Sequence, residues 1–201
     1  MKLKKIEVAI LMALVLTAMI QITGFAAGCE GIKENVLRLH VIANSDSGED
    51  QALKLKVRDA ILEQGKEIFD GAKDVSEAQA KIEYSKADLK TAAQEVIRQE
   101  GYDYDVEIDI GKEYFDTRVY DEITLPAGEY RAVRIIIGDG NGKNWWCVMF
   151  PPLCLPGASQ TQELDAVLDD GGIQVVKSDP QVDARFKIVE IFEKFTKMFK
   201  S

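Results

Sequence analysis

The strongest constraint on this chain is an uncharged and almost wholly apolar run over residues 8–20, which follows three lysines within the first five residues. Small residues at 26–28 come next, directly before Cys29. A basic start, an apolar run and a small-residue cleavage site, in this order, are typical of a secretory signal. We therefore predict that residues 1–28 are a signal peptide or an N-terminal membrane anchor, and that the remainder works outside the cytoplasm.

The sequence leaves three fates open for this segment. Residues 8–20 are short for a membrane span of about 20 residues, which favours a cleaved signal, but Ile22 and Phe25 lengthen the run enough for an uncleaved anchor. Cys29 is a candidate lipidation site, because it follows small residues, although Ala26 stands where such motifs usually carry Leu. In every case the lysines before the run favour a cytoplasmic N-terminus and export of the body.

Composition limits what the exported part can do. The chain has 201 residues, 46% of them hydrophobic, which suits one packed domain behind the N-terminal segment. Its net charge of −9 disfavours nucleic-acid binding, which needs clustered Lys and Arg. The same acidity gains nothing from an anionic membrane surface, so we expect membrane contact only through the N-terminal segment.

Apolar periodicity predicts a strand followed by two helices. Residues 37–43 alternate, with Leu37, Leu39 and Val41 on one face. A polar turn follows, in which Ser47 and Asp50 have the spacing of a helix-capping box. Helical stripes then predict helices over about 49–70 and 74–99, which end near Gly71 and Gly101.

A four-strand meander is predicted next. Residues 104–110 alternate, Gly111 and Lys112 form a turn, and further strands follow over about 115–123, 130–137 and 144–150. Helices followed by a run of strands favour an α+β fold. We expect the two N-terminal helices to pack on one face of a mainly antiparallel sheet, within a domain at 36–155.

The C-terminal extension, 156–201, is harder to interpret. It contains a possible short helix at 162–168 and a possible short strand at 173–176. A strongly amphipathic helix over 180–199 closes the chain. We expect this helix to dock on the domain core; the alternative is a helix that binds a partner or a membrane at a free end.

The search for chemistry finds no catalytic residue, cofactor site or metal site. A Ser/His/Asp triad would have to use His40, the only histidine, with Ser45 and Asp46 nearby, but no Gly-x-Ser-x-Gly elbow surrounds the serine. One His and three scattered Cys do not form a zinc site. The glycines at 138–142 lack the Lys-Ser/Thr of a phosphate loop.

Residues 145–154 are the most unusual stretch, because two Trp, two Pro and two Cys occur within ten positions. Cys147 and Cys154 are a candidate disulfide, since oxidation is possible outside the cytoplasm; two buried thiols are the alternative. Adjacent Trp residues on a strand point to opposite faces, so one of Trp145 and Trp146 is available for a partner.

Two blocks of this sequence resemble the stage II sporulation protein R family. The first block is Leu37-Arg38-Leu39-His40-Val41-Ile42-Ala43-Asn44-Ser45-Asp46-Ser47, followed by Asp50-Gln51, Lys54 and Val57-Arg58-Asp59. The second runs from Trp145 to Cys154. The resemblance covers about 37–155, and the closing amphipathic helix is also similar.

The resemblance implies a signalling protein and no enzyme. Members of the family are made in the forespore and exported into the intermembrane space of the sporulation septum. There they trigger a membrane-embedded aspartic protease of the mother cell, which removes the pro-sequence of a sigma factor precursor. No catalytic residue, cofactor or small-molecule substrate carries over from the family.

Two surfaces are candidates for partner contact. The first is the polar turn with the helix row behind it, whose plainer interpretation is solvated charge plus a helix cap; it comprises Asn44, Ser45, Asp46, Asp50, Lys54 and Arg58. The second comprises Trp145, Trp146, Pro151 and Pro152. Two other functions stay open: an envelope hydrolase that uses Ser45 and His40, and a lipid-anchored extracytoplasmic binding module.

Overall fold

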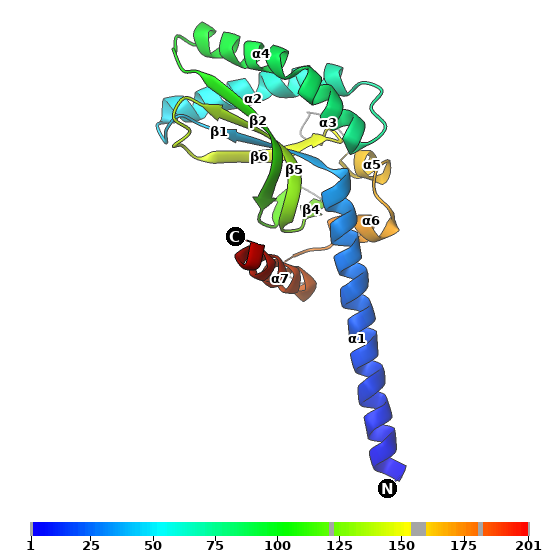
Figure 1. Ribbon diagram of the computed structural model, residues 1–201. Coiled ribbons are helices and arrows are strands. Elements are labelled where there is room, and N and C mark those ends of the chain that lie inside the picture. Colours follow the sequence, from blue (N-terminus) through cyan, green and yellow to red (C-terminus); the bar gives the residue numbers. More distant parts are fainter. Residues whose placement is uncertain (1, 121–122, 154–159, 181–182, 201) are drawn as a thin grey trace. The chain divides into compact units, whose positions relative to one another are not determined.

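The computed structural model describes residues 2–120, 123–153, 160–180 and 183–200, and it divides the chain into two compact units (Figure 1). The sheet unit comprises 33–115 and 129–167. The terminal unit comprises 1–32, 116–128 and 168–201, and thus includes both chain ends.

Four strands form the central sheet of the sheet unit. They are β1 (Leu37–Ile42), β2 (Val106–Phe115), β5 (Gly128–Ile137) and β6 (Asn144–Phe150), in the order β2-β5-β1-β6. β1 runs parallel to β5 and antiparallel to β6. The fold is α+β as predicted, but the sheet is mixed, and the predicted meander is wrong because β1 lies between β5 and β6. Alternation of apolar and polar residues within a strand predicts which face of that strand is buried. It does not predict which other strands pair with it.

Three helices cover one face of this sheet. α2 (Gly48–Phe69) begins at its cap Ser47, whose Oγ accepts a hydrogen bond from the Asp50 amide at 3.1 Å. The predicted second helix is in fact two, α3 (Val75–Tyr84) and α4 (Lys86–Gln99), with the break at Ser85. The apolar positions keep helical spacing across the break, so their pattern does not reveal it.

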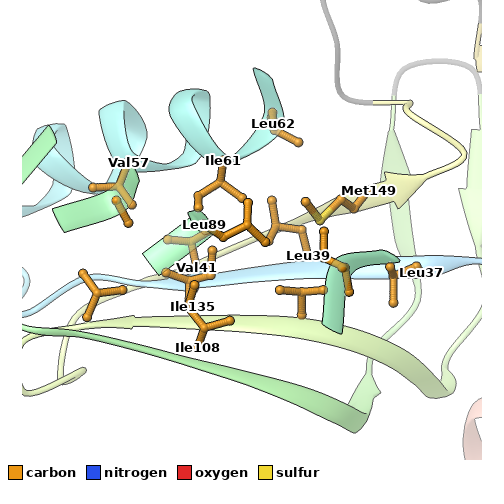
Figure 2. Close-up of a cluster of buried hydrophobic side chains, with 14 of the residues drawn as sticks. Leu37, Leu39, Val41, Val57, Ile61, Leu62, Leu89, Ile108, Ile135 and Met149 are labelled. Atoms are coloured by element: carbon orange, nitrogen blue, oxygen red, sulfur yellow. The ribbon is translucent and has the colours of Figure 1, made fainter. Parts of the chain in front are cut away.

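The core lies between the sheet and these helices, as Figure 2 shows. Leu37, Leu39 and Val41 of β1 are fully buried there, as the alternation predicted. Ile61 of α2 and Leu89 of α4 reach the same cluster and are also fully buried. The first strand is therefore central to the unit, with neighbours on both edges.

The region after the helices departs from the predicted meander. β2 continues through Gly111, where a turn was expected, because a glycine is tolerated within a strand. The predicted strand at 115–123 is instead two short strands, β3 (Arg118–Tyr120) and β4 (Ile123–Leu125). These pair antiparallel in a separate two-stranded sheet.

The N-terminal segment forms one continuous helix, α1 (Lys2–Asn35), seen in blue in Figure 1. It extends through residues 30–35, beyond the predicted N-terminal segment 1–28. Within the described residues, this is the one helix long and apolar enough to cross a membrane. Residues 4–24 are exposed on all sides, whereas Phe25, Cys29 and Ile32 are buried along one stripe.

The described part of the C-terminal segment contains three helices, α5 (Gln160–Asp165), α6 (Asp170–Val176) and α7 (Ala184–Lys200). A helix therefore replaces the strand expected at 173–176, and Asp169 caps it by accepting from the Gly172 amide at 2.8 Å. The expected docking of the closing helix on the domain core stays a prediction. Phe192 in α7 is 68% exposed, while Phe186 on the opposite side of the helix is 2% exposed.

Candidate partner-binding surfaces

The predicted polar turn is the centre of a hydrogen-bonded structure that we call the turn cluster, formed by residues 43–51 and 138–143. Both Asn44 and Ser45 donate to one carboxylate oxygen of Asp50, Oδ2, at 2.9 Å and 2.5 Å. The side-chain oxygen of Asn44 accepts from the Asp139 amide at 3.0 Å. Side-chain hydrogen bonds thus connect the turn to the start of α2 through Asp50, and to the 138–143 loop through Asn44.

The 138–143 loop lies directly against this turn. The Gly142 amide donates to the Ala43 carbonyl at 2.9 Å, and the Lys143 amide donates to Asp46 Oδ1 at 2.7 Å. A Cβ atom added at Gly142 would collide with the Ser45 carbonyl oxygen. Only glycine therefore permits this close approach of two backbones.

Asp50 and Lys54 are internal partners of this cluster. They are only 5% and 4% exposed, so the predicted surface row of Asp50, Lys54 and Arg58 is wrong. The physical reason is that the first turns of α2 face the 138–143 loop: Lys54 Nζ donates to the Lys143 carbonyl at 2.8 Å and to Gln51 at 2.6 Å.

Hydrogen bonding and burial shift the pKa values of Asp50 and Lys54. The hydrogen bond from Ser45 lowers the pKa of Asp50 most, and the one from Asn44 also lowers it, while burial opposes both. Burial lowers the pKa of Lys54, because desolvation disfavours the charged ammonium. For these residues the plainer interpretation, a structural cap, is the one that the geometry favours.

The two adjacent tryptophans point to opposite faces of β6, as predicted. Trp145 packs on the helix-covered side, where the guanidinium of Arg58 lies 4.8 Å from its ring centre. Trp146 stacks on His40 on the other side, with ring centres 5.6 Å apart and an interplanar angle of 28°. Both indoles are half-buried.

His40 is paired with a residue that the sequence did not suggest. Its Nδ1 lies 2.8 Å from Glu113 Oε1, and its side chain is 7% exposed. Ser45 bonds instead to Asp50, so each member of the proposed hydrolase pair has another partner. The geometry thus gives no support to a Ser45–His40 nucleophile and base.

The sheet face that carries His40 holds further polar side chains. His40 pairs in register with Arg134 of β5, and Arg134 donates to Asp109 at 2.9 Å. Arg38 is fully buried, with its guanidinium 4.1 Å from the centre of the Phe115 ring. In the sequence, Arg38 and His40 alternate with the apolar residues of β1, which indicates that the two side chains share the other face of the sheet. This pattern does not reveal which residues of β2 and β5 they contact.

A groove of about 330 Å³ borders the second predicted surface. Pro151, which follows a cis peptide bond from Phe150, lines it together with Pro152. The opposite wall is the end of α2, which contributes Lys66 and Phe69. Both prolines of the unusual stretch therefore face an open and partly apolar surface.

The cysteines are only partly described. Cys147 is 3% exposed and disulfide-bonded, and Cys29 is a buried thiol that forms no disulfide. Cys154 lies outside the described residues, so its pairing with Cys147 stays a prediction. In the part of the chain that the structure describes, no group of three or more His, Cys, Asp or Glu side chains could hold a metal ion.

Comparison with known proteins identifies the sheet unit. A family model for stage II sporulation protein R matches residues 33–160. The chain belongs to the stage II sporulation protein R family. Within the family, stage II sporulation protein R of Bacillus subtilis (strain 168) is 42% identical over 126 residues, which cover 61% of this chain and 55% of that relative. No solved structure matches the chain.

Proposed function

We propose that this chain is an exported signal of endospore formation, which activates a membrane-embedded aspartic protease of the mother cell and thereby causes processing of a sigma factor precursor. The observation that carries the proposal is the combination of a sheet unit of the stage II sporulation protein R family with an N-terminal helix fit to cross a membrane. Three lysines near the N-terminus favour a cytoplasmic start, so the sheet unit emerges on the far side.

The packing of α1 favours an anchor that is retained. Phe25, Cys29 and Ile32 are 5%, 1% and 0% exposed, and the Phe25 ring contacts Phe186 edge to face at 5.0 Å. A Cβ atom added at Gly28 would collide with the Gly171 carbonyl oxygen. Cleavage before Cys29, which lipidation of that residue requires, would remove Phe25 and Gly28 from this packing. We therefore propose a tethered signal, with Cys29 unmodified.

For the contact with the protease, we propose the groove beside Pro151 and Pro152. The turn cluster is occupied by internal hydrogen bonds, whereas the groove is open and combines apolar walls with Lys66 and Lys73. Partly apolar grooves with charged rims are common in protein recognition.

Reconstitution tests the proposed function. The full chain is co-expressed with the protease and the sigma factor precursor in a bacterium that does not sporulate, and precursor cleavage is followed by immunoblot. We expect cleavage only when all three proteins are present. Equal cleavage in cells that lack this chain would show that the chain is not the activating signal.

A matched pair of variants tests the groove. Lys66 lies 3.5 Å from Glu63, and Lys112, away from the groove, lies 3.3 Å from Glu129. Both are exposed lysines with one acidic neighbour, so Lys66→Glu and Lys112→Glu alter surface charge alike. We expect Lys66→Glu to reduce precursor cleavage and Lys112→Glu to leave it unchanged. Equal cleavage by the two variants would exclude the groove as the contact.

A further inference from the structure

The closing helix α7 has an unusual arrangement of its faces. Its large apolar side chains point outward and are 46% to 69% exposed; they are Ile188, Ile191, Phe192, Phe195 and Met198. Phe186 on the opposite side of the helix is 2% exposed, and the Glu190 side chain, on that same side, is 17% exposed. A helix of a water-soluble unit normally turns its apolar stripe inward, so this stripe is built for an apolar environment outside the protein.

The first turn of α7 packs on α1 at Phe25, which is the first buried residue after the exposed residues 4–24. Phe186 contacts Phe25 at 5.0 Å, and the guanidinium of Arg185 lies 4.5 Å from the centre of the Phe25 ring. Arg185 is held in turn by Asp183, with its Nη2 2.6 Å from the carboxylate. The pKa of Asp183 is lowered chiefly by this hydrogen bond, which keeps the carboxylate charged beside the guanidinium.

This contact places α7 beside a membrane surface. The exposed part of α1, residues 4–24, spans about 30 Å at 1.5 Å per residue, which is the thickness of the hydrocarbon core of a bilayer. Phe25 is the next residue, so the first turn of α7 lies where α1 leaves the bilayer.

The charge of α7 suits the same surface. Its sequence carries five basic and two acidic residues, whereas the whole chain has a net charge of −9. Amphipathic helices with a basic polar face and with Phe on the apolar side lie in the interface of anionic membranes. α7 and residues 2–32 of α1 lie outside the region that the family model matches.

We propose that α7 lies in the outer interface of the membrane that α1 spans, with its apolar stripe inserted among the lipids. α7 then forms a second attachment beside α1 and limits how the exported part can turn about its anchor. This inference does not depend on activation of a protease, and it revises the expectation that the N-terminal segment is the sole membrane contact.

Depth-dependent fluorescence quenching tests the proposal in the full chain. Phe192→Trp places a probe on the apolar stripe, and Glu193→Trp places a matched probe on the opposite face one residue away. Both chains are reconstituted into vesicles of phosphatidylglycerol and phosphatidylethanolamine that contain brominated lipids, and the signal of the parent chain, which has Trp145 and Trp146, is subtracted.

We expect the probe at 192 to be quenched about twofold more than the probe at 193, most strongly by bromine roughly 5–10 Å below the headgroups. The difference should persist when the chain is diluted in lipid, and Ile191→Glu together with Phe195→Glu should abolish it. Equal quenching of the two probes would overturn the proposal. Quenching that disappears on dilution, with crosslinked dimers at high density, would overturn it in favour of pairing between two copies of α7.

Discussion

The sheet unit and the terminal unit place their apolar side chains in opposite ways. In the sheet unit, β1 and α2 direct theirs into a closed core, where Leu39 and Ile61 are fully buried. In the terminal unit, Leu14 of α1 and Phe192 of α7 are 63% and 68% exposed. This difference supports our proposal that α1 and α7 contact lipid, whereas the apolar side chains of the sheet unit form a closed core.

The two units also differ in how they use polar groups. In the sheet unit, carboxylates such as Asp50 are buried and receive several hydrogen bonds, which fixes a turn to a distant loop. In the terminal unit, charged residues of α7 flank an apolar stripe whose described side chains are 46% to 69% exposed. We infer that the sheet unit carries the signal and that the terminal unit holds it at the membrane.

The largest predicted effect contrasts a buried with an exposed apolar side chain. Leu39→Ala should lower the free energy of unfolding of the sheet unit by about 2–5 kcal/mol, because it leaves a cavity in a closed core. Ile191→Ala, at a position 64% exposed, should change it by less than about 0.5 kcal/mol. Urea unfolding in detergent, followed by tryptophan fluorescence, measures both. Similar losses of unfolding free energy in Leu39→Ala and Ile191→Ala would show that the Ile191 side chain is packed as closely as Leu39, which contradicts its exposure on α7.

A smaller effect is expected from a methyl group at the turn cluster. Gly142→Ala should lower the free energy of unfolding by about 1–3 kcal/mol, because the new Cβ meets the Ser45 carbonyl oxygen. Gly48→Ala is the control: no atom lies within 4 Å of its added Cβ, and the change should stay within about 0.5 kcal/mol. The same unfolding assay applies. An equal result for both glycines would mean that the 138–143 loop does not pack on the turn.

The buried carboxylate predicts a pH dependence. Asp50→Asn should lower the free energy of unfolding by about 1–3 kcal/mol near neutral pH, because Asn44 and Ser45 then donate to a neutral amide instead of a charged carboxylate. The folded pKa of Asp50 lies below the unfolded value of about 3.9, so its stabilisation is fully present above about pH 4 and is lost as the pH falls through the folded pKa.

Unfolding of the parent chain and of Asp50→Asn, measured between neutral and acid pH, tests this linkage. The gap between the two chains should narrow below about pH 4. Asp59→Asn is the control at neutral pH: its carboxylate is 64% exposed, so the substitution should cost less than about 1 kcal/mol of unfolding free energy. A gap for Asp50→Asn that stays constant into strong acid would show that the carboxylate does not stabilise the turn as an anion.

The smallest effect concerns the contact of Arg58 with Trp145. Arg58→Ala should cost about 0.5–1 kcal/mol, as expected for a cation lying over an indole ring at a partly exposed site. It should also shift the tryptophan emission of the folded chain. Lys56→Ala, whose partner is Glu100, serves as the control and should leave the emission unchanged. An unchanged emission in Arg58→Ala would show that the stacking is not formed.

The sequence predicted those features that depend on local periodicity. It correctly predicted the buried face of β1, the cap at Ser47 and the extent of β6. It could not reveal that β1 lies between β5 and β6, because strand neighbours depend on contacts over about a hundred residues. The break at Ser85 was hidden by an apolar stripe that continues across it.

Local sequence patterns were equally insufficient for the candidate surfaces, because burial there depends on contacts with distant parts of the chain. The spacing of Ser47 and Asp50 predicted a cap, but the burial of Asp50 and Lys54 depends on the distant 138–143 loop. The amphipathic pattern of the closing helix was evident, yet amphipathicity alone does not say whether protein or lipid covers the apolar side. The exposure of Phe192 and the burial of Phe186 are the observations on which our proposal for α7 rests.

We propose that the sheet unit signals from outside the membrane that α1 crosses. Precursor cleavage in the co-expression host tests it most directly when the parent chain is compared with Leu14→Arg, which puts a charge in the middle of the exposed apolar run and opposes membrane insertion. We expect precursor cleavage by Leu14→Arg to fall to the level of cells without the chain, while Leu14→Ala retains cleavage. Full cleavage by a Leu14→Arg chain that fractionation finds in the cytoplasm would contradict the claim.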